Sequence, residues 1–310
     1  MTVRTEKEAG VWTIIHDRPE ARNAMDPQSA DALTRAFLEF DADETACVAV
    51  VYGAGGAFCA GWDLKYVSTL DADYPLGELD IPVAAPRGNG GEIPRGPLGP
   101  SRLELSKPVI AAIEGPAVAG GMELGLWCDF RVMAVDSYFG VYCRRWGVPL
   151  IDGGTVRLPR IVGQGRALEI ILTGRKVPAE ECLRIGLCEY VTPSGGARDK
   201  AEQLAREIAR FPQVCVRADR RSAIKSHGLS LREALIQEWY NGREALVRDG
   251  GDRSEPLSRR PRPAWRFQQI LRAREGEIKQ LRGTRLLCGI GQDLAERQLA
   301  DVSRPQLVDG

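Results

Sequence analysis

Apolar residues in the first part of the chain alternate between strand-like and helix-like spacing. Residues 11–15 (VWTII) and 47–53 (CVAVVYG) are short, continuous apolar runs rich in β-branched side chains, which is typical of buried strands. Between them, residues 26–43 begin with a capping residue and then carry apolar side chains at helical spacing. This order predicts a strand, a helix and a second strand.

The same order returns in the next part of the chain. Residues 108–115 predict another buried strand, residues 120–128 an apolar helix, and residues 130–134 and 138–141 two short strands. Beyond residue 153 the pattern is mostly helical. Strands that alternate with helices indicate an α/β fold.

The pattern also divides the chain into regions. We expect a core over residues 1–195, a helical region over 196–250, and a polar, poorly patterned tail over 251–310. Residues 71–100 are rich in proline and glycine and show no periodicity. Such a segment inside a compact domain predicts a mobile loop near a functional site.

The charge balance limits the classes of partner. The 310 residues include 42 basic and 42 acidic side chains, so no global field attracts nucleic acid or an anionic membrane. No apolar run approaches the length of a membrane span, and the amino terminus lacks the apolar core of a signal peptide. We therefore expect a cytoplasmic protein with neither nucleic-acid nor membrane partners.

The cysteines and histidines exclude some kinds of chemistry. The eight cysteines contain no C-x-x-C pair, and in a reducing compartment most are expected to be buried thiols. With only two histidines in the sequence, a Ser-His-Asp triad or a histidine-rich metal site is not expected. We therefore expect no metal.

Glu123 is the candidate acid/base. It stands in a predicted helix that otherwise contains glycine, methionine, leucine and tryptophan, so burial is expected. Burial raises the pKa of a carboxyl group and prepares it for general acid/base catalysis. A glutamate that caps the helix or pairs with an arginine is the alternative.

Two backbone N–H groups are candidate oxyanion donors. If the helix begins at Gly120, its first N–H groups are unpaired and lie on the same face as Glu123. The sequence FCAGWDLK (58–65) places a large ring next to a glycine turn, which suggests that the backbone of Trp62 has the functional role. Two such donors make an oxyanion hole, in which each is typically worth about 2.7–4 kcal/mol.

Four motifs in this order resemble those of the crotonases, the enoyl-CoA hydratase/isomerase superfamily. The resemblance runs from about residue 10 to residue 250 and rests on RPEARNAMD (18–26), GAGGAFCAGWDLK (53–65), SKPVIAAIEGPAVAGGMELGLWCDFRV (106–132) and GGTVRLPRIVGQGRALEIILTGR (153–175). It implies a spiral of ββα units with a C-terminal helical trimerisation region. The implied assembly is a homotrimer or a dimer of trimers.

The resemblance also implies the substrate and the roles of several residues. The substrate is an acyl-CoA thioester, and no cofactor is expected beyond the coenzyme A that the substrate carries. The thioester oxygen lies between the N–H groups that match Trp62 and Gly120, and Glu123 matches the first glutamate of the family. Substrate-binding positions are expected at Arg22, Ala24, Ala60 and Lys65.

The chain departs from the hydratase pattern at the second glutamate. By its spacing from Phe139 and Gly140, the matching position is Cys143, which is either a catalytic substitute or a small core residue. Asp152 either supplies the missing carboxylate or caps the following helix.

The leading functional hypothesis is enoyl-CoA hydration, the addition of water to a 2,3 double bond. The alternatives are double-bond isomerisation, C–C cleavage or thioester hydrolysis on the same scaffold. A non-catalytic acyl-CoA binder is the alternative from another class of protein.

Overall fold

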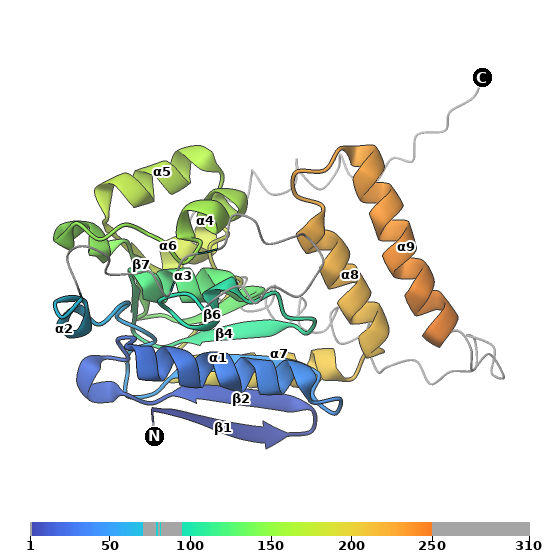
Figure 1. Cartoon of the computed structure of the whole chain (residues 1–310), viewed down its shortest axis with the longest axis horizontal. Coiled ribbons are helices and arrows are strands. Elements are labelled where there is room, and N and C mark those ends of the chain that lie inside the picture. The colour runs from blue at the N-terminus through green and yellow to red at the C-terminus, as the bar shows by residue number, and fades with distance from the viewer. Residues whose placement is uncertain (1, 71–78, 80, 82–94, 250–310) are drawn as a thin grey trace, which may run out of the picture. The chain divides into compact units, whose positions relative to one another are not determined.

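A six-stranded sheet lies at the centre of the part of the chain that the computed structural model describes, residues 2–70, 79, 81 and 95–249 (Figure 1). All neighbours in this sheet are parallel except the first pair, which is antiparallel. The strands, in spatial order, are β1 (Val3–Glu8), β2 (Val11–His16), β3 (Val48–Gly53), β4 (Val109–Ile113), β6 (Phe130–Ala134) and β9 (Tyr190–Thr192).

A smaller sheet of three strands accompanies it in the same described residues. β5 (Pro116–Val118) pairs in parallel with β7 (Tyr138–Gly140), which pairs antiparallel with β8 (Lys176–Pro178). Because β4 runs directly into β5, the chain passes from one sheet to the other just before the apolar helix α3 (Gly120–Trp127).

The two faces of the large sheet bury different clusters of side chains, because successive residues of a strand point in opposite directions. In β3, Val48 and Val50 pack in a cluster with Ala201 of α7 (Ala197–Ala209). Ala49 and Val51 belong to a larger cluster on the other face, which includes Phe37 of α1 (Pro27–Ala42) and residues of α3. The sheet therefore lies between α7 on one side and α1 and α3 on the other.

Helix α1 shows how the sequence specifies a local element. Asp26 accepts a hydrogen bond from the amide of Ser29 at 2.8 Å and so caps the helix, and Pro27 occupies the first helical position. The apolar stripe of α1 is fully buried in the core.

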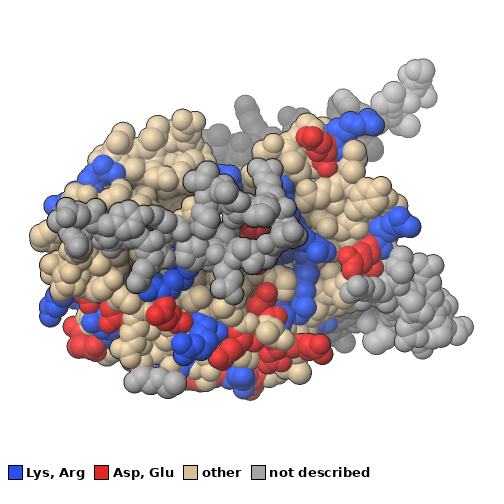
Figure 2. All heavy atoms as spheres, in the orientation of Figure 1, with Lys and Arg blue, Asp and Glu red and all other residues tan. Residues whose placement is uncertain are grey.

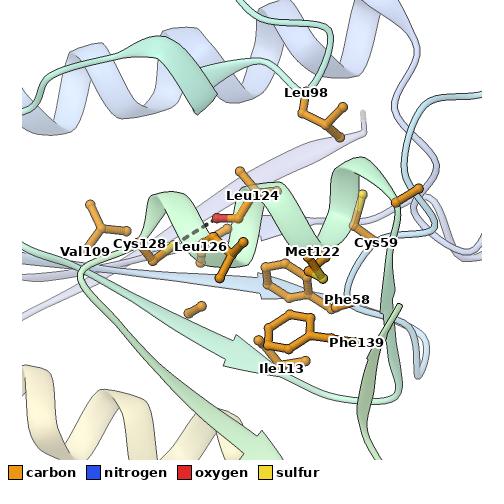
Figure 3. Packing of buried hydrophobic residues seen from close by; sticks show 14 of the residues in the cluster. Phe58, Cys59, Leu98, Val109, Ile113, Met122, Leu124, Leu126, Cys128 and Phe139 are labelled. Carbon is orange, nitrogen blue, oxygen red and sulfur yellow. Dashed lines mark hydrogen bonds between the residues drawn. The ribbon is translucent and has the colours of Figure 1, made fainter. Parts of the chain in front are cut away.

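Helix α3 is buried almost all round (Figure 3). Met122 lies toward Phe58 and Phe139, whereas Leu98 lies on the opposite side of the helix. The thiol of Cys128, the C-cap residue of α3, donates back to the carbonyl oxygen of Leu124 in the helix at 3.5 Å. A polar side chain on this helix is therefore forced into an apolar surrounding.

The remaining helices lie between the strands or after the last of them. They are α2 (Leu64–Val67), α4 (Gly154–Val162), α5 (Gln164–Thr173), α6 (Ala179–Arg184), α8 (Gln213–Lys225), α9 (Leu231–Asp249) and the 3-10 helices Pro19–Ala21, Pro100–Arg102 and Tyr142–Trp146. No helix within the described residues combines the length and apolar character that crossing a bilayer requires.

Charged side chains are mixed in sign on the face that Figure 2 presents. Acidic and basic residues alternate over the part of that face where Figure 1 places α1 and β1, whereas the part over α5 carries few charges. This distribution agrees with the equal numbers of acidic and basic residues in the sequence.

The predicted α/β fold is confirmed, and each strand and helix predicted up to residue 141 lies within two residues of its expected ends. The sequence did not predict β1, whose side chains after Val3 are exposed. It also did not predict β8 and β9, which interrupt the expected helical region. The predicted tail, residues 251–310, lies outside the described residues, as does most of the predicted 71–100 loop.

Candidate active site

A strained turn leads into α3 and sets the direction of its first N–H groups. Ala119, the residue before the helix, has φ 54° and ψ −125°, a conformation that favours glycine and costs a residue with a side chain about 1–3 kcal/mol. Its amide donates to the carbonyl oxygen of Gly140 at 2.8 Å, and its own carbonyl accepts from the amides of Met122 and Glu123. The surrounding structure therefore holds the start of α3 in one orientation.

The chain around Trp62 lies directly beside this turn. The amide of Val118 donates to the carbonyl oxygen of Cys59 at 3.0 Å. A Cβ built on Gly61, where φ is +90°, would lie 3.1 Å from the nitrogen of Gly120. Only a glycine at residue 61 allows this approach without strain.

The amides of Trp62 and Gly120 are unpaired in the described part of the chain, because neither has an acceptor there. Both residues line the same pocket. Two unpaired N–H groups on adjacent segments beside a pocket have the composition of an oxyanion hole.

A partly buried ion pair fixes the segment that carries Trp62. Arg18 contacts Asp63 at 2.7 Å and donates to the carbonyl oxygen of Ala24 at 2.8 Å. Met25 donates to the carbonyl of Gly61, and the amide of Asp63 donates back to the carbonyl of Met25, both at 2.8 Å. Burial, the largest single effect, acts to raise the pKa of Asp63, but the hydrogen bond and charge of Arg18 and the amides of Lys65 and Tyr66 together outweigh it, so this pKa is below its ordinary value.

Glu123 extends from the first turn of α3 into the same pocket, and only 2% of it is exposed. Its Oε1 accepts from the amides of Asp152 at 2.9 Å and of Gly154 at 2.8 Å. Burial, with a further contribution from the charge of Asp152, raises its pKa to about 7. A carboxyl group with this pKa is both a competent acid and a competent base near neutral pH.

Asp152 places a second carboxyl group in the pocket, with 1% of the residue exposed. Its Oδ1 accepts from the hydroxyl of Ser101 and, at 3.1 Å, from the amide of Leu98. Its Oδ2 is buried and has no hydrogen-bond partner among the described residues. Burial raises the pKa of Asp152 above its ordinary value.

Asp152 does not cap the following helix. α4 begins at Gly154, and its N-cap residue, Gly153, provides no side-chain hydrogen bond. Of the two roles that the sequence left open for Asp152, the geometry agrees with a carboxyl group in the pocket.

The pocket has the mostly apolar lining, with a few polar groups, that is typical of small-molecule sites. Its apolar lining includes Leu64, Leu98, Tyr142, Trp146, Val148 and Ile151. Two acidic groups therefore lie in a mostly apolar surrounding, which explains the raised pKa of each.

Cys143 lines this pocket and is also part of the apolar core. Burial and then the charge of Glu123 raise the pKa of its thiol. A neutral thiol is a poor proton acceptor. A neutral thiol differs in this respect from a carboxylate, and the catalytic role of Cys143 stays a prediction.

The structure brings five of the predicted site residues to one pocket: Trp62, Gly120, Glu123, Cys143 and Asp152. Of the predicted substrate-binding residues, Ala60 also lines it. Arg22, Ala24 and Lys65 lie on the neighbouring segments, outside the lining, and their roles stay predictions. Arg22 and Lys65 are exposed.

Sequence reasoning missed the residues that surround Asp152. Leu98 lies within the unpatterned segment and Ser101 directly follows it, and nothing in their spacing indicates contact with residue 152. Arg157 donates to the main-chain carbonyls of Asp152 and Ser101, at 2.8 Å and 2.7 Å. The only available signal was its place in the GGTVRLPR motif.

Comparison with known proteins agrees with this geometry. The family model described as enoyl-CoA hydratase/isomerase matches residues 6–75 and 101–240. The enoyl-CoA hydratase EchA19 of Mycobacterium tuberculosis is 33% identical over 251 residues, which cover 79% of this chain and 88% of that protein. The (E)-benzylidenesuccinyl-CoA hydratase of Thauera aromatica is 32% identical over 273 residues, or 86% and 99% of the two chains.

Solved structures show the same fold. The crystal structure of an enoyl-CoA hydratase from Mycobacterium tuberculosis superimposes with a TM-score of 0.70 at 32% identity, covering 79% of this chain and 90% of that one. That of EchA1 from Mycobacterium marinum gives 0.70 at 33% identity, covering 81% and 92%. The motifs, the fold and these similarities together show that the chain belongs to the enoyl-CoA hydratase/isomerase family.

Proposed function

We propose that this protein adds water to the 2,3 double bond of an enoyl-CoA thioester, or removes it in the reverse reaction. The observation that carries the proposal is the presence of two buried carboxyl groups, Glu123 and Asp152, in a pocket that also presents two unpaired backbone amides. Similar proteins named as hydratases and as a carnitinyl-CoA dehydratase support this class of reaction.

The two amides would stabilise the charge that develops on the substrate. When water adds to C3, the electron pair of the double bond moves toward the thioester carbonyl, and its oxygen becomes negative. The N–H groups of Trp62 and Gly120 donate to that oxygen. Preorganised donors of this kind typically contribute about 2.7–4 kcal/mol each.

The two carboxyl groups would divide the proton transfers. Burial and mutual repulsion keep one of them protonated near neutral pH, because two close carboxylates in an apolar pocket do not both ionise. The free Oδ2 of Asp152 accepts the proton of the attacking water, whose oxygen bonds to C3. Glu123, with its pKa of about 7, donates a proton to C2.

Double-bond isomerisation is the alternative reaction on this scaffold. It needs a single group that moves one proton between two carbons, and Glu123 suffices for that. The cysteine at residue 143 is the observation that keeps this alternative open, because the resemblance leads us to expect a carboxylate there.

Product analysis on matched substrates tests the proposal. The purified protein is incubated with 2-enoyl-CoA and 3-enoyl-CoA esters of the same chain lengths, and the products are identified by mass spectrometry. We expect 3-hydroxyacyl-CoA from the 2-enoyl ester. Isomerisation of the 3-enoyl ester without any hydration would contradict the proposal. The homotrimer or dimer of trimers and the cytoplasmic location stay predictions.

A further inference from the structure

Arg157 lies next to the two carboxyl groups and forms an ion pair with neither of them in the part of the chain that the structure describes. Its Nη1 donates to the main-chain carbonyl oxygen of Asp152 at 2.8 Å, and its Nη2 donates to that of Ser101 at 2.7 Å. The guanidinium group therefore joins α4 to the two segments that meet at Asp152. It contacts their main chains and leaves the carboxyl groups available for proton transfer.

The local backbone makes room for this contact. Gly153 has φ +95°, and a Cβ on it would lie 2.2 Å from Nη1 of Arg157. The guanidinium group thus packs directly on the main chain of residue 153. The next residue, Gly154, packs closely against the other acid. A Cβ built on it would lie 2.9 Å from Oε1 of Glu123.

The hydrogen bonds of this segment continue from Arg157 to both acids. Ser101, whose carbonyl Arg157 holds, donates through its hydroxyl to Oδ1 of Asp152. The amides of Asp152 and Gly154, on the main chain that Arg157 also holds, donate to Oε1 of Glu123. A displacement of residues 152–154 would therefore move both carboxyl groups together.

The charge of Arg157 acts in the same direction on both acids. It favours their ionised forms and lowers the pKa of each, against the larger effect of burial. Other titratable or charged groups near this cluster lie just after α3, on α4 and β6, on the 3-10 helices Pro100–Arg102 and Tyr142–Trp146, and on the segment before Trp62: Cys128, Arg160, Arg131, Arg102, Cys143 and Cys59. None of these has a hydrogen bond to the carbonyls of Asp152 or Ser101.

We propose that Arg157 is a positioning residue for the acid/base pair, which fixes Asp152 and Glu123 by holding the main chain at residues 101 and 152. The inference rests on the proposed hydration reaction for its kinetic consequences. It predicts that loss of the two-armed contact lowers kcat more than it changes KM, because the reacting groups are misplaced while the rest of the pocket is intact.

Two variants separate the geometry of Arg157 from its charge. Arg157→Lys keeps the charge and loses the paired donors, and Arg157→Gln loses both. We expect each to lower kcat for hydration by about 10–100-fold with a much smaller change in KM. Only Arg157→Gln should displace the pH profile of kcat to higher pH. Arg166→Gln, which changes an exposed arginine on the next helix, α5, is the matched control and should leave kcat and the profile unchanged.

A titration that needs no reaction completes the test. The infrared band of the Glu123 carboxyl group, identified as the band that Glu123→Gln removes, is followed with pH in the ligand-free protein. We expect its midpoint to rise above about 7 in Arg157→Gln. Wild-type kcat, profile and midpoint in both variants would overturn the inference. The inference would also be overturned if both variants only reduced the amount of folded protein and left the titration midpoint of Glu123 unchanged. A wild-type protein without hydration activity refutes the proposed function alone, since the band still titrates.

Discussion

Replacing Glu123 by glutamine should stabilise the protein at neutral pH and leave its stability unchanged in acid. The folded protein raises the pKa of Glu123 from its ordinary value of 4.5 to about 7. Between these values the folded state binds the proton more tightly than the unfolded state does. The wild type therefore loses stability as the pH rises through this interval, and above about 7 the loss is complete.

The size of the effect follows from the two pKa values. At 1.36 kcal/mol per pKa unit, an increase from 4.5 to about 7 corresponds to about 3 kcal/mol. Glutamine has no charge to desolvate, and its Oε1 still accepts from the amides of Asp152 and Gly154. The variant should therefore be about 3 kcal/mol more stable than the wild type near pH 8, and equally stable near pH 4.

Urea denaturation of both proteins over this pH range measures the difference directly. Glu8→Gln, at an exposed position of β1, is the matched control, because water surrounds that carboxylate in both states. A stability difference between Glu123→Gln and the wild type that does not change with pH would refute the reasoning. It would mean that the carboxyl group is not the source of the free-energy cost.

The activities of four variants test the parts of the site separately. Glu123→Gln should lower turnover by about 10²–10⁴-fold, the usual contribution of general acid/base catalysis, and near-normal steady-state turnover would contradict its role. Trp62→Phe should keep most activity because the backbone amide acts, whereas Gly120→Pro should lose at least about 100-fold while its circular dichroism spectrum shows a folded protein. Gly154→Ala should lower kcat with little change in KM, because the added Cβ would lie 2.9 Å from Oε1 of Glu123; unchanged kcat would show that the carboxyl group tolerates displacement.

The strands that the sequence predicted correctly are those whose burial is nearly uniform. All six residues of β2 are buried, so the apolar run of VWTII sufficed to predict it. β1 has the opposite character: after Val3 its side chains are charged or polar and exposed. Its strand structure arises from main-chain pairing with β2 at the edge of the sheet, which side-chain pattern does not record.

The residues of the site also differ in how far the sequence could predict them. Glu123 was predictable because an isolated charge in an apolar helix is conspicuous in the sequence. The second carboxyl group left alternatives, because whether Asp152 capped a helix or entered the pocket depended on where α4 begins. The contacts of Arg157 were not predictable. Its partners are main-chain carbonyls, which leave no pattern in the sequence, and one of them belongs to Ser101, 56 residues away.

The central claim is that Asp152, and not the residue at position 143, supplies the second carboxyl group for hydration. The most direct test compares the hydration rates of Asp152→Asn and Cys143→Ala on the same 2-enoyl-CoA ester, with isomerisation of the matching 3-enoyl ester measured in parallel. We expect Asp152→Asn to lose at least about 100-fold in hydration rate and Cys143→Ala to stay near the wild type. A severe loss in Cys143→Ala with Asp152→Asn unaffected would contradict the claim. The claim would also be contradicted if neither variant changed the hydration rate and isomerisation stayed at the wild-type level.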